Sequence, residues 1–169
     1  MLEGLKLLPA KIFVDDRGFF SELYQKKVCE EAGIRCPFVQ DNLSYSRKGV
    51  LRGMHFQAGP GQAKLVSVLE GEIFDVAVDI RDGSPTFGQW EGVTLTPETQ
   101  FFIPAGFAHG FYVLSDHAYV FYKVSSYYDP AQEKTFRFND PQVNIQWPGS
   151  AFTLAARDQH APFFEELFV

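Results

Sequence analysis

The pattern that most constrains the fold is a series of short apolar segments that proline and glycine separate at frequent intervals. The breaks between segments contain Gly83, Pro85, Pro97, Pro104 and Pro130. Many short strands at turn spacing, with little helix between them, are typical of an all-β sandwich or barrel. Among these folds we expect a jelly roll. The strand-like segments after the central region occupy 64–69, 72–80, 89–96, 100–103, 110–114, 117–126 and 135–138.

The N-terminal region carries its own turn and helix signals. Residues 5–24 are predicted to form two strands joined by a turn at Asp15–Gly18. Residues 25–32 are predicted to form a helix that ends at Gly33, since glycine favours the position just after a helix.

Two predictions concern the later strands and the tail. The segments 64–69 and 72–80 flank Glu70-Gly71, and this spacing predicts a hairpin between them. Residues 151–169 have a weaker pattern, with one short helix predicted at 162–167. No linker or repeat divides the 169 residues, so we expect a single domain over 1–169.

The central stretch 40–66 combines strand-like patterning with chemically active side chains. Its segment Val50–Gln57 is apolar enough to be buried, yet it contains Arg52 and His55. Burying such groups is costly unless they are paired or used. Strict alternation would put the two side chains on opposite faces of a strand. A bulge near Gly53 would bring both to one cavity; otherwise Arg52 serves a different wall.

Charge and hydropathy exclude some classes of partner. The net charge of −6 argues against general affinity for nucleic acid. Four basic residues, Arg17, Arg52, Lys64 and Arg157, could still form a pocket for a phosphorylated ligand. No stretch approaches the roughly 18 uninterrupted apolar residues that a membrane span needs. The N-terminus does not resemble a signal peptide and the two cysteines form no disulfide framework, so we expect a cytoplasmic protein.

The histidines raise the question of a metal. The segment Pro104–His109 resembles P-x-G-x-x-H, the second half of the cupin metal signature. The first half should supply H-x-H, but the chain has His55-Phe56-Gln57. A catalytic metal wants about three protein ligands, so we expect no metal and no cofactor. His55 is then a candidate general base, because imidazole titrates near neutral pH. The alternative is a structural histidine in the core.

Several longer stretches together resemble one family. They are DDRGFFSELY, FVQDNLSYSRKGVLRGMHFQ, QAKLVSVLEGEIFDVAVDIRDGSPTFGQW, FFIPAGFAHGFYVLS and YKVSSYYDPAQE. The chain resembles the dTDP-4-dehydrorhamnose 3,5-epimerases from Asp15 to about Leu167. Met54 stands where that family usually has leucine.

The resemblance implies a fold, an assembly and a reaction. The fold would be a metal-free, cupin-type jelly roll (a double-stranded β-helix) with a few short helices. The assembly would be a homodimer that exchanges N-terminal strands. The substrate would be a dTDP-4-keto-6-deoxyhexose. Proton removal and return through an enolate would invert C3 and C5 of dTDP-4-dehydro-6-deoxy-D-glucose and give dTDP-4-dehydro-L-rhamnose.

The same resemblance implies four catalytic roles. His55 would be the base, and Asp158 would hold its Nδ1–H and leave Nε2 free to accept a proton. Tyr122 would be the acid on the other side of the sugar, and Lys64 would stabilise the enolate oxygen. Taken singly, each of these residues fits a structural role better than a catalytic one, and only the joint pattern favours catalysis.

The remaining matches are substrate contacts. Arg17 and Glu22 would contact the nucleotide, as would the segment of Gln40, Asp41 and Asn42. Arg52 would contact the diphosphate or sugar, His109 the sugar, and Tyr128 the face of the thymine. Two further ligand contacts would be Glu133 and Arg157.

Three alternatives stay open at this level. A related enzyme could invert C3 alone, a nucleotide-sugar binding cupin could lack catalysis, and a metal cupin could be an oxygenase. Deuterium incorporation at C3 and C5, at C3 only, or nowhere separates the first two from the 3,5-epimerase. Metal analysis of the purified protein separates the third.

Overall fold

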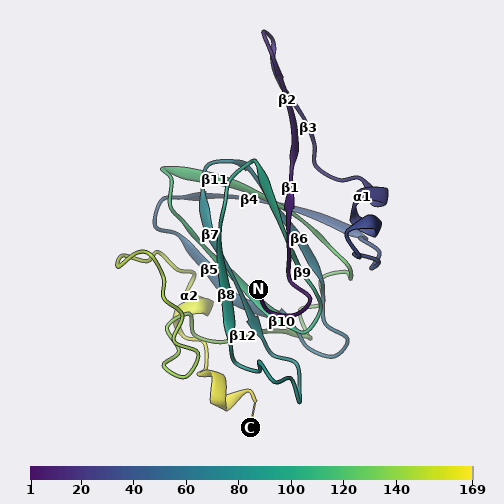
Figure 1. Ribbon diagram of the computed structural model, residues 1–169. Coiled ribbons are helices and arrows are strands. Elements are labelled where there is room, and N and C mark those ends of the chain that lie inside the picture. Colours follow the sequence, from purple (N-terminus) through teal and green to yellow (C-terminus); the bar gives the residue numbers. More distant parts are fainter. Residues whose placement is uncertain (169) are drawn as a thin grey trace.

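Two antiparallel sheets of five strands each form the body of the molecule, and a third, two-stranded sheet projects from it (Figure 1). The structure is a computed structural model that describes residues 1–168. The first sheet has the order β1 (Lys6–Pro9), β9 (Thr99–Ile103), β6 (Lys64–Glu70), β11 (His117–Val124) and β4 (Gln40–Arg47). The second has the order β12 (Glu133–Thr135), β5 (Leu51–Gln57), β10 (Phe107–Val113), β7 (Ile73–Asp79) and β8 (Trp90–Leu95). The all-β expectation is confirmed.

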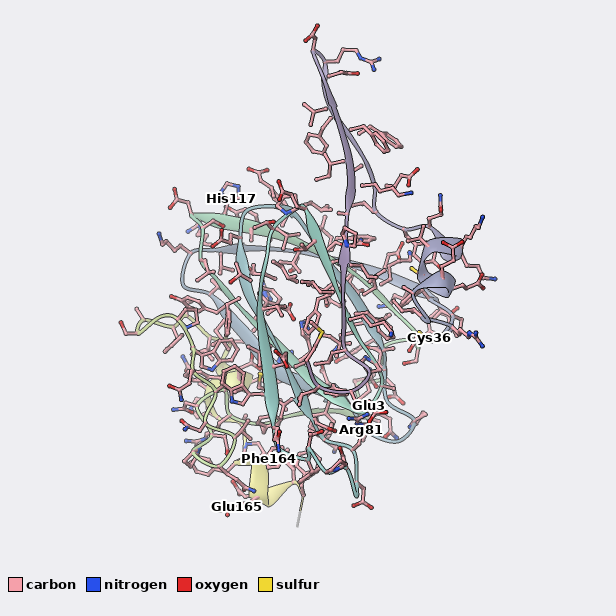
Figure 2. The ribbon with its side chains drawn as sticks, viewed as in Figure 1. Glu3, Cys36, Arg81, His117, Phe164 and Glu165 are labelled. Atoms are coloured by element: carbon pink, nitrogen blue, oxygen red, sulfur yellow. The ribbon has the colours of Figure 1, made fainter. Side chains whose placement is uncertain are left out.

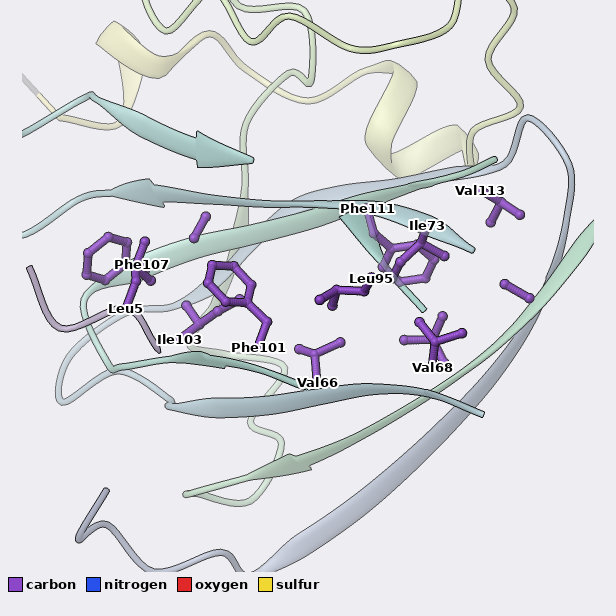
Figure 3. Close-up of a cluster of buried hydrophobic side chains, with 13 residues drawn as sticks. Leu5, Val66, Val68, Ile73, Leu95, Phe101, Ile103, Phe107, Phe111 and Val113 are labelled. Atoms are coloured by element: carbon purple, nitrogen blue, oxygen red, sulfur yellow. The ribbon is translucent and has the colours of Figure 1, made fainter. Parts of the chain in front are cut away.

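The main core lies between the two sheets. Figure 3 shows Val66 and Phe101 of the first sheet facing Ile73 and Phe111 of the second. Burying each such side chain contributes roughly 1.5–3 kcal/mol, so this cluster dominates the stability of the sandwich. The strands alternate between a face that reaches this core and an opposite face, as their sequence pattern predicts.

A second core covers the outer face of the second sheet. Val76 and Val78 of β7 pack there against Met54, Phe136 and Phe164. The last two belong to the C-terminal segment, which crosses this face of the sheet (Figure 1). Strand β7 is therefore covered on both sides, and its alternation turns Asp75 and Ala77 toward the interior between the sheets.

The predicted hairpin between 64–69 and 72–80 is wrong. Strand β6 pairs with β9 and β11 in the first sheet, whereas β7 pairs with β10 and β8 in the second. A turn does follow Glu70, where Gly71 has φ +94°, but it carries the chain from one sheet to the other. The local pattern could not decide this, because both strands are buried on both faces and alternation specifies faces rather than partners.

The N-terminal predictions are largely confirmed. Strands β2 (Lys11–Asp15) and β3 (Gly18–Glu22) form a hairpin that extends away from the body, with side chains on both of its faces (Figure 2). Helix α1 spans Lys26–Glu31, and Gly33 follows it with φ +80°.

The predictions for the C-terminal region are partly wrong. The strand predicted at 135–138 is instead β12, two residues earlier. Helix α2 (Ala156–Gln159) was not predicted, and the expected helix at 162–167 is the 3₁₀ turn η1 (Phe164–Glu166). Among residues 1–168, no helix has both the length and the apolar character needed to cross a membrane.

Candidate active site

A β-bulge in β5 brings Arg52 and His55 to the same cavity. His55 lies opposite His109 and Arg52 lies opposite Phe111, so β5 contains one residue more than β10 between these pairs. Gly53 occupies the bulge with φ +139°, and a Cβ there would lie 2.6 Å from Gly110 Cα. Only glycine fits this position. The bulge predicted from the sequence is confirmed.

The cavity lies between the two sheets, and side chains from both sheets and from α2 line it. Ten residues that the sequence singled out line it: Gln40, Asn42, Arg52, His55, Lys64, His109, Tyr122, Tyr128, Glu133 and Arg157. Five lining residues were not predicted: Ser44, Phe56, Gln57, Gln62 and Phe111. Ser44 follows Gln40 and Asn42 at the period of two that a strand face requires, so alternation could have identified it. Its Oγ is buried and has no hydrogen-bond partner within residues 1–168.

Three predicted contact residues lie outside this cavity. Asp41 projects from the other face of β4, where its carboxylate accepts a hydrogen bond of 2.6 Å from Lys123 Nζ. Arg17 and Glu22 belong to the projecting hairpin, where Arg17 is paired with Asp15. A single copy of the chain therefore does not bring these three residues to the cavity.

His55 is held by Asp158 from behind the cavity wall. Asp158 is only 2 % exposed, and its Oδ1 lies 2.7 Å from His55 Nε2. Its Oδ2 accepts a hydrogen bond of 3.3 Å from Gly53 N–H. The contact is therefore through Nε2 and not through Nδ1 as expected. A neutral imidazole that donates Nε2–H to Asp158 keeps its lone pair on Nδ1.

The Asp158 carboxylate is stabilised in its charged form. Burial alone would raise the pKa of this carboxyl group, but the hydrogen bonds from His55 and Gly53 and the charge of Arg157 lower its pKa below the ordinary value. Asp158 thus remains an acceptor, which fixes the orientation of the imidazole and its tautomer.

Arg157 connects the imidazole to the outer part of the cavity. Its Nη2 lies 3.0 Å from His55 Nε2, and its Nη1 is ion-paired with Glu133. The same Glu133 oxygen accepts a hydrogen bond of 2.9 Å from the Tyr128 hydroxyl. Because Nε2–H already donates to Asp158, the guanidinium group contacts the ring without adding a hydrogen bond to it.

Lys64 contributes a buried ammonium group. The residue is 7 % exposed, and burial lowers its pKa to about 8, although the charges of Asp75 and Glu133 oppose this effect. Within residues 1–168, no carboxylate lies close enough to form an ion pair with its Nζ. The ammonium group is therefore available to a ligand.

His109 has a carboxylate partner of its own. Its Nε2 lies 2.9 and 3.0 Å from the two oxygens of Asp75, which is fully buried. Burial lowers the pKa of His109, and the neighbouring Asp75 charge only partly offsets this. Asp75 was not predicted as a site residue. The available signal was an aspartate on the interior face of a strand beside Ala77.

Tyr122 lies on the wall opposite His55. It belongs to β11 of the first sheet, whereas His55 belongs to β5 of the second (Figure 1). Tyr122 pairs with Val66 and Val124 pairs with Lys64, so Tyr122 and Lys64 are near neighbours on the same face of the first sheet. Burial raises the pKa of the Tyr122 hydroxyl, which therefore stays protonated at neutral pH. The cavity thus offers a proton acceptor, a proton donor and a cation.

The donor set does not form an evident metal site. No three His, Cys, Asp or Glu side chains in the described part of the chain converge as metal ligands. Each cavity histidine instead contacts one carboxylate. The absence of a metal or cofactor stays a prediction that metal analysis of the purified protein tests.

Comparisons with known proteins identify the family. The family model described as dTDP-4-dehydrorhamnose 3,5-epimerase matches residues 1–166. The chain belongs to the dTDP-4-dehydrorhamnose 3,5-epimerase family. The Salmonella typhimurium dTDP-4-dehydrorhamnose 3,5-epimerase is 50% identical over 165 residues, which cover 95% of this chain and 90% of that one.

Solved structures agree with this family assignment. The 3,5-epimerase of Legionella pneumophila, in complex with dTDP-4-keto-L-rhamnose, matches with a TM-score of 0.91 and 55% identity, over 95% of this chain and 88% of that one. A 3'-monoepimerase from Streptomyces bikiniensis, in complex with dTDP-quinovose, matches with a TM-score of 0.89 and 37% identity, over 98% of this chain and 87% of that one. This epimerase-family chain thus shares the cupin-type fold expected from its sequence.

Proposed function

We propose that the chain inverts C3 and C5 of dTDP-4-dehydro-6-deoxy-D-glucose and produces dTDP-4-dehydro-L-rhamnose. The observation that carries this proposal is the cavity between the sheets. His55 and Tyr122 occupy opposite walls there, and the Lys64 ammonium group has no carboxylate partner among residues 1–168. Two groups that exchange protons from opposite sides of a sugar ring are what an inversion at carbon requires.

The reaction follows from the acidity that the C4 ketone confers on its neighbours. The Nδ1 lone pair of His55 removes the proton from C3 or C5, and the C–H electron pair moves to the ketone oxygen as an enolate. The Lys64 ammonium group stabilises the negative oxygen, and such preorganised charge is usually a large part of catalysis. Tyr122 then donates its proton to the opposite face of the carbon. Exchange with solvent restores both groups.

The nucleotide is bound at the outer part of the cavity. Tyr128 stacks on the thymine, and Arg52 and Arg157 bind the diphosphate, for which a planar fork of donors is well suited. Gln40, Asn42 and Glu133 contact the nucleotide portion, and His109 contacts the sugar. Arg157 exchanges its partner Glu133 for a phosphate oxygen when the substrate enters.

Solvent deuterium exchange tests the function. The purified chain is incubated with dTDP-4-dehydro-6-deoxy-D-glucose in D₂O, and label is located by NMR. We expect deuterium at C3 and at C5. Label at C3 alone would replace the proposal with the C3-only activity, which the 37% identity to a 3'-monoepimerase keeps as the second candidate. Binding without label would indicate a non-catalytic nucleotide-sugar protein.

The substitution Tyr122→Phe is expected to separate the two proton transfers. Because the base His55 is intact, exchange of the substrate protons continues, while formation of inverted product falls by about 10²–10⁴-fold. Comparing label in recovered substrate with label in product measures this ratio. Tyr119→Phe, which removes a hydroxyl from the outer face of the same strand, is the matched control. Unchanged product formation in Tyr122→Phe would exclude this hydroxyl as the acid.

We further propose that the chain acts as a homodimer in which the β2–β3 hairpin completes the cavity of the partner. The hairpin carries Phe13, Val14, Phe19 and Phe20, which are 56, 80, 69 and 65 % exposed. Phe13 pairs with Phe20 and Val14 pairs with Phe19, so both faces of the hairpin expose apolar side chains. Exposed apolar surface of this kind marks an interaction site. An isolated two-stranded hairpin is also only marginally stable in water. Arg17 and Glu22 on this hairpin would thereby reach a nucleotide that they do not reach within one copy.

Co-expressing two impaired variants, with activity measured at a substrate concentration below KM, tests this arrangement. Arg17→Ala is expected to raise KM about tenfold or more through the lost charged contact, and His55→Ala to remove the base. Co-expressed chains should regain about a quarter of the wild-type sites, since half of the dimers are mixed and each has one intact cavity. No recovery in demonstrated mixed dimers would mean that Arg17 acts in its own subunit.

The cytoplasmic location expected from the sequence stays a prediction.

A further inference from the structure

Asp75 is a carboxylate in a position that the fold reserves for apolar side chains. It lies on the interior face of β7 between Ile73 and Ala77, both of which belong to the main core, and it is 0 % exposed. Both of its oxygens contact a single donor, His109 Nε2. A carboxylate offers about four acceptor positions, and burying one with so few donors is costly. The sandwich itself gains nothing from this charge.

The charge of Asp75 is not balanced by an arginine. Of the two carboxylates that influence Lys64, Glu133 is ion-paired with Arg157. Asp75 contacts only an imidazole within residues 1–168, and burial lowers the pKa of that imidazole. Burial raises the pKa of Asp75, and the charges of His109 and Lys64 oppose this effect. Lys64 lines the same cavity as His109, so its charge favours the ionised form of Asp75, although the two groups form no ion pair within residues 1–168.

The other groups around Lys64 supply no unpaired negative charge to stabilise its ammonium form. The neighbouring strands β9 and β4 turn no ionisable side chain toward the cavity. Besides Lys64, the ionisable groups that do face it are His55 and Arg52 on β5, His109 on β10, Tyr122 on β11, Tyr128 between β11 and β12, Glu133 on β12 and Arg157 on α2. The histidines and the tyrosines are neutral when ready to react, and the arginines are cationic. Asp75, which contacts His109, is the carboxyl group near Lys64 that has no arginine partner within residues 1–168.

We propose that Asp75 is a positioning residue of the reaction, which holds His109 as the Nε2–H tautomer and keeps Lys64 protonated from a distance. The imidazole of His109 lies between the carboxylate and the cavity, so the carboxylate does not bind the ammonium group directly. A direct ion pair would occupy the donor that the enolate needs. This inference rests on the proposed epimerase function, because it assigns Lys64 a role in that reaction.

Asp75→Asn tests the inference with little change of shape. The amide oxygen still accepts Nε2–H, but the negative charge is lost. We expect the pH above which kcat falls to shift downward by about one unit or more. The reason is that losing the negative charge at position 75 makes the protonated form of Lys64 less favourable. Activity at pH 6 should stay close to that of the wild type, and KM should change little. Asp116→Asn, which removes an exposed carboxylate next to β11, is the matched control and should leave the profile unchanged.

A second measurement does not depend on catalysis. NMR of lysine labelled at Cε reports the titration of Lys64 directly, and Lys64→Met identifies its signal. The expected result is a titration below the ordinary lysine range in the wild type and lower still in Asp75→Asn.

The outcomes separate the two proposals. If the wild-type protein catalyses no deuterium exchange, the proposed epimerase function is wrong. The Lys64 titration then still tests whether Asp75 keeps Lys64 protonated. An equal loss of activity at every pH in Asp75→Asn, or an unshifted Lys64, overturns the inference and leaves Asp75 a structural residue. If Asp75→Asn does not fold, the wild-type titration decides, because a Lys64 that titrates at about 10.4 needs no supporting charge.

Discussion

Replacing His55 with alanine is expected to abolish deuterium incorporation at both C3 and C5. His55 is held by Asp158 at 2.7 Å. In the proposed mechanism this one imidazole serves both carbons, so both exchanges depend on the same lone pair. A positioned base contributes about 10²–10⁴-fold, and we expect kcat to fall by at least this factor. NMR of the substrate after incubation in D₂O measures each carbon separately. Exchange that persists at one carbon would identify a second base there.

Two further variants separate the base from its support. Asp158→Asn leaves the imidazole but removes the charge that fixes its tautomer, so we expect a smaller loss than in His55→Ala. His160→Ala removes an exposed histidine whose Nδ1 lies 2.8 Å from the carbonyl oxygen of Ala156, at the end of the short helix that carries Asp158. It should remain active. If His160→Ala were as inactive as His55→Ala, the result would indicate a disturbed α2 rather than a lost base.

Lys64→Met is expected to make the protein more stable and nearly inactive. The ammonium group is buried and forms no ion pair with the described residues, and its pKa is lowered to about 8 from 10.5. At 1.36 kcal/mol per pKa unit, this penalty amounts to about 3 kcal/mol at pH 7. Methionine has a similar length and no charge, so the free energy of unfolding should rise by up to this amount. The enolate loses its cation, and kcat should fall by about 10²–10³-fold.

The contribution of Lys64 to the free energy of unfolding is expected to depend on pH. Because Lys64 has a lower pKa in the folded state, the unfolded chain binds more protons between about pH 8 and 10.5. Its contribution therefore destabilises the fold below pH 8, and the penalty decreases as the pH rises through this window. Denaturant unfolding at several pH values measures the free energy of unfolding of wild type and of Lys64→Met. The difference between the two values should become smaller from pH 8 to 10.5.

The control for this prediction is an exposed lysine. Lys48→Met removes a surface ammonium group that lies 4.0 Å from Asp116, and it should change neither stability nor activity by much. A Lys64→Met variant that is less stable than wild type would show that the ammonium group has a structural partner. Retained activity would mean that the enolate oxygen is stabilised by another donor.

Local patterns predicted most of the strands and one detail of the site. The conflict between burial and charge in Val50–Gln57 led to the bulge at Gly53, because a strand can bring two such side chains together in few other ways. Alternation within 72–80 also puts Asp75 and Ala77 on one face of this strand. It could not predict that this face is the interior, since both faces of the strand are covered.

Errors arose where distant segments meet. Strands 64–69 and 72–80 are adjacent in sequence but pair in different sheets, and their turn signal is the same in either case. The contact of Asp158 with Nε2 rather than Nδ1 of His55 depends on how α2 approaches β5, and these segments are separated by about a hundred residues. The pairing of Asp75 with His109 depends in the same way on the register of β7 against β10.

By itself, the amino-acid sequence determined the fold class, the family and most of the residues that line the cavity, because periodicity and motif spacing are local properties of the chain. Only the tertiary structure decided which of those residues meet. It put His55 and Tyr122 on opposite sheets and left Lys64 without an ion pair in the part of the chain that the structure describes. It also kept Arg17, Glu22 and Asp41 outside the cavity of their own copy. The physical reason is that charge balance and proton transfer depend on distances of a few ångströms between strands, and these distances follow from sheet pairing and packing.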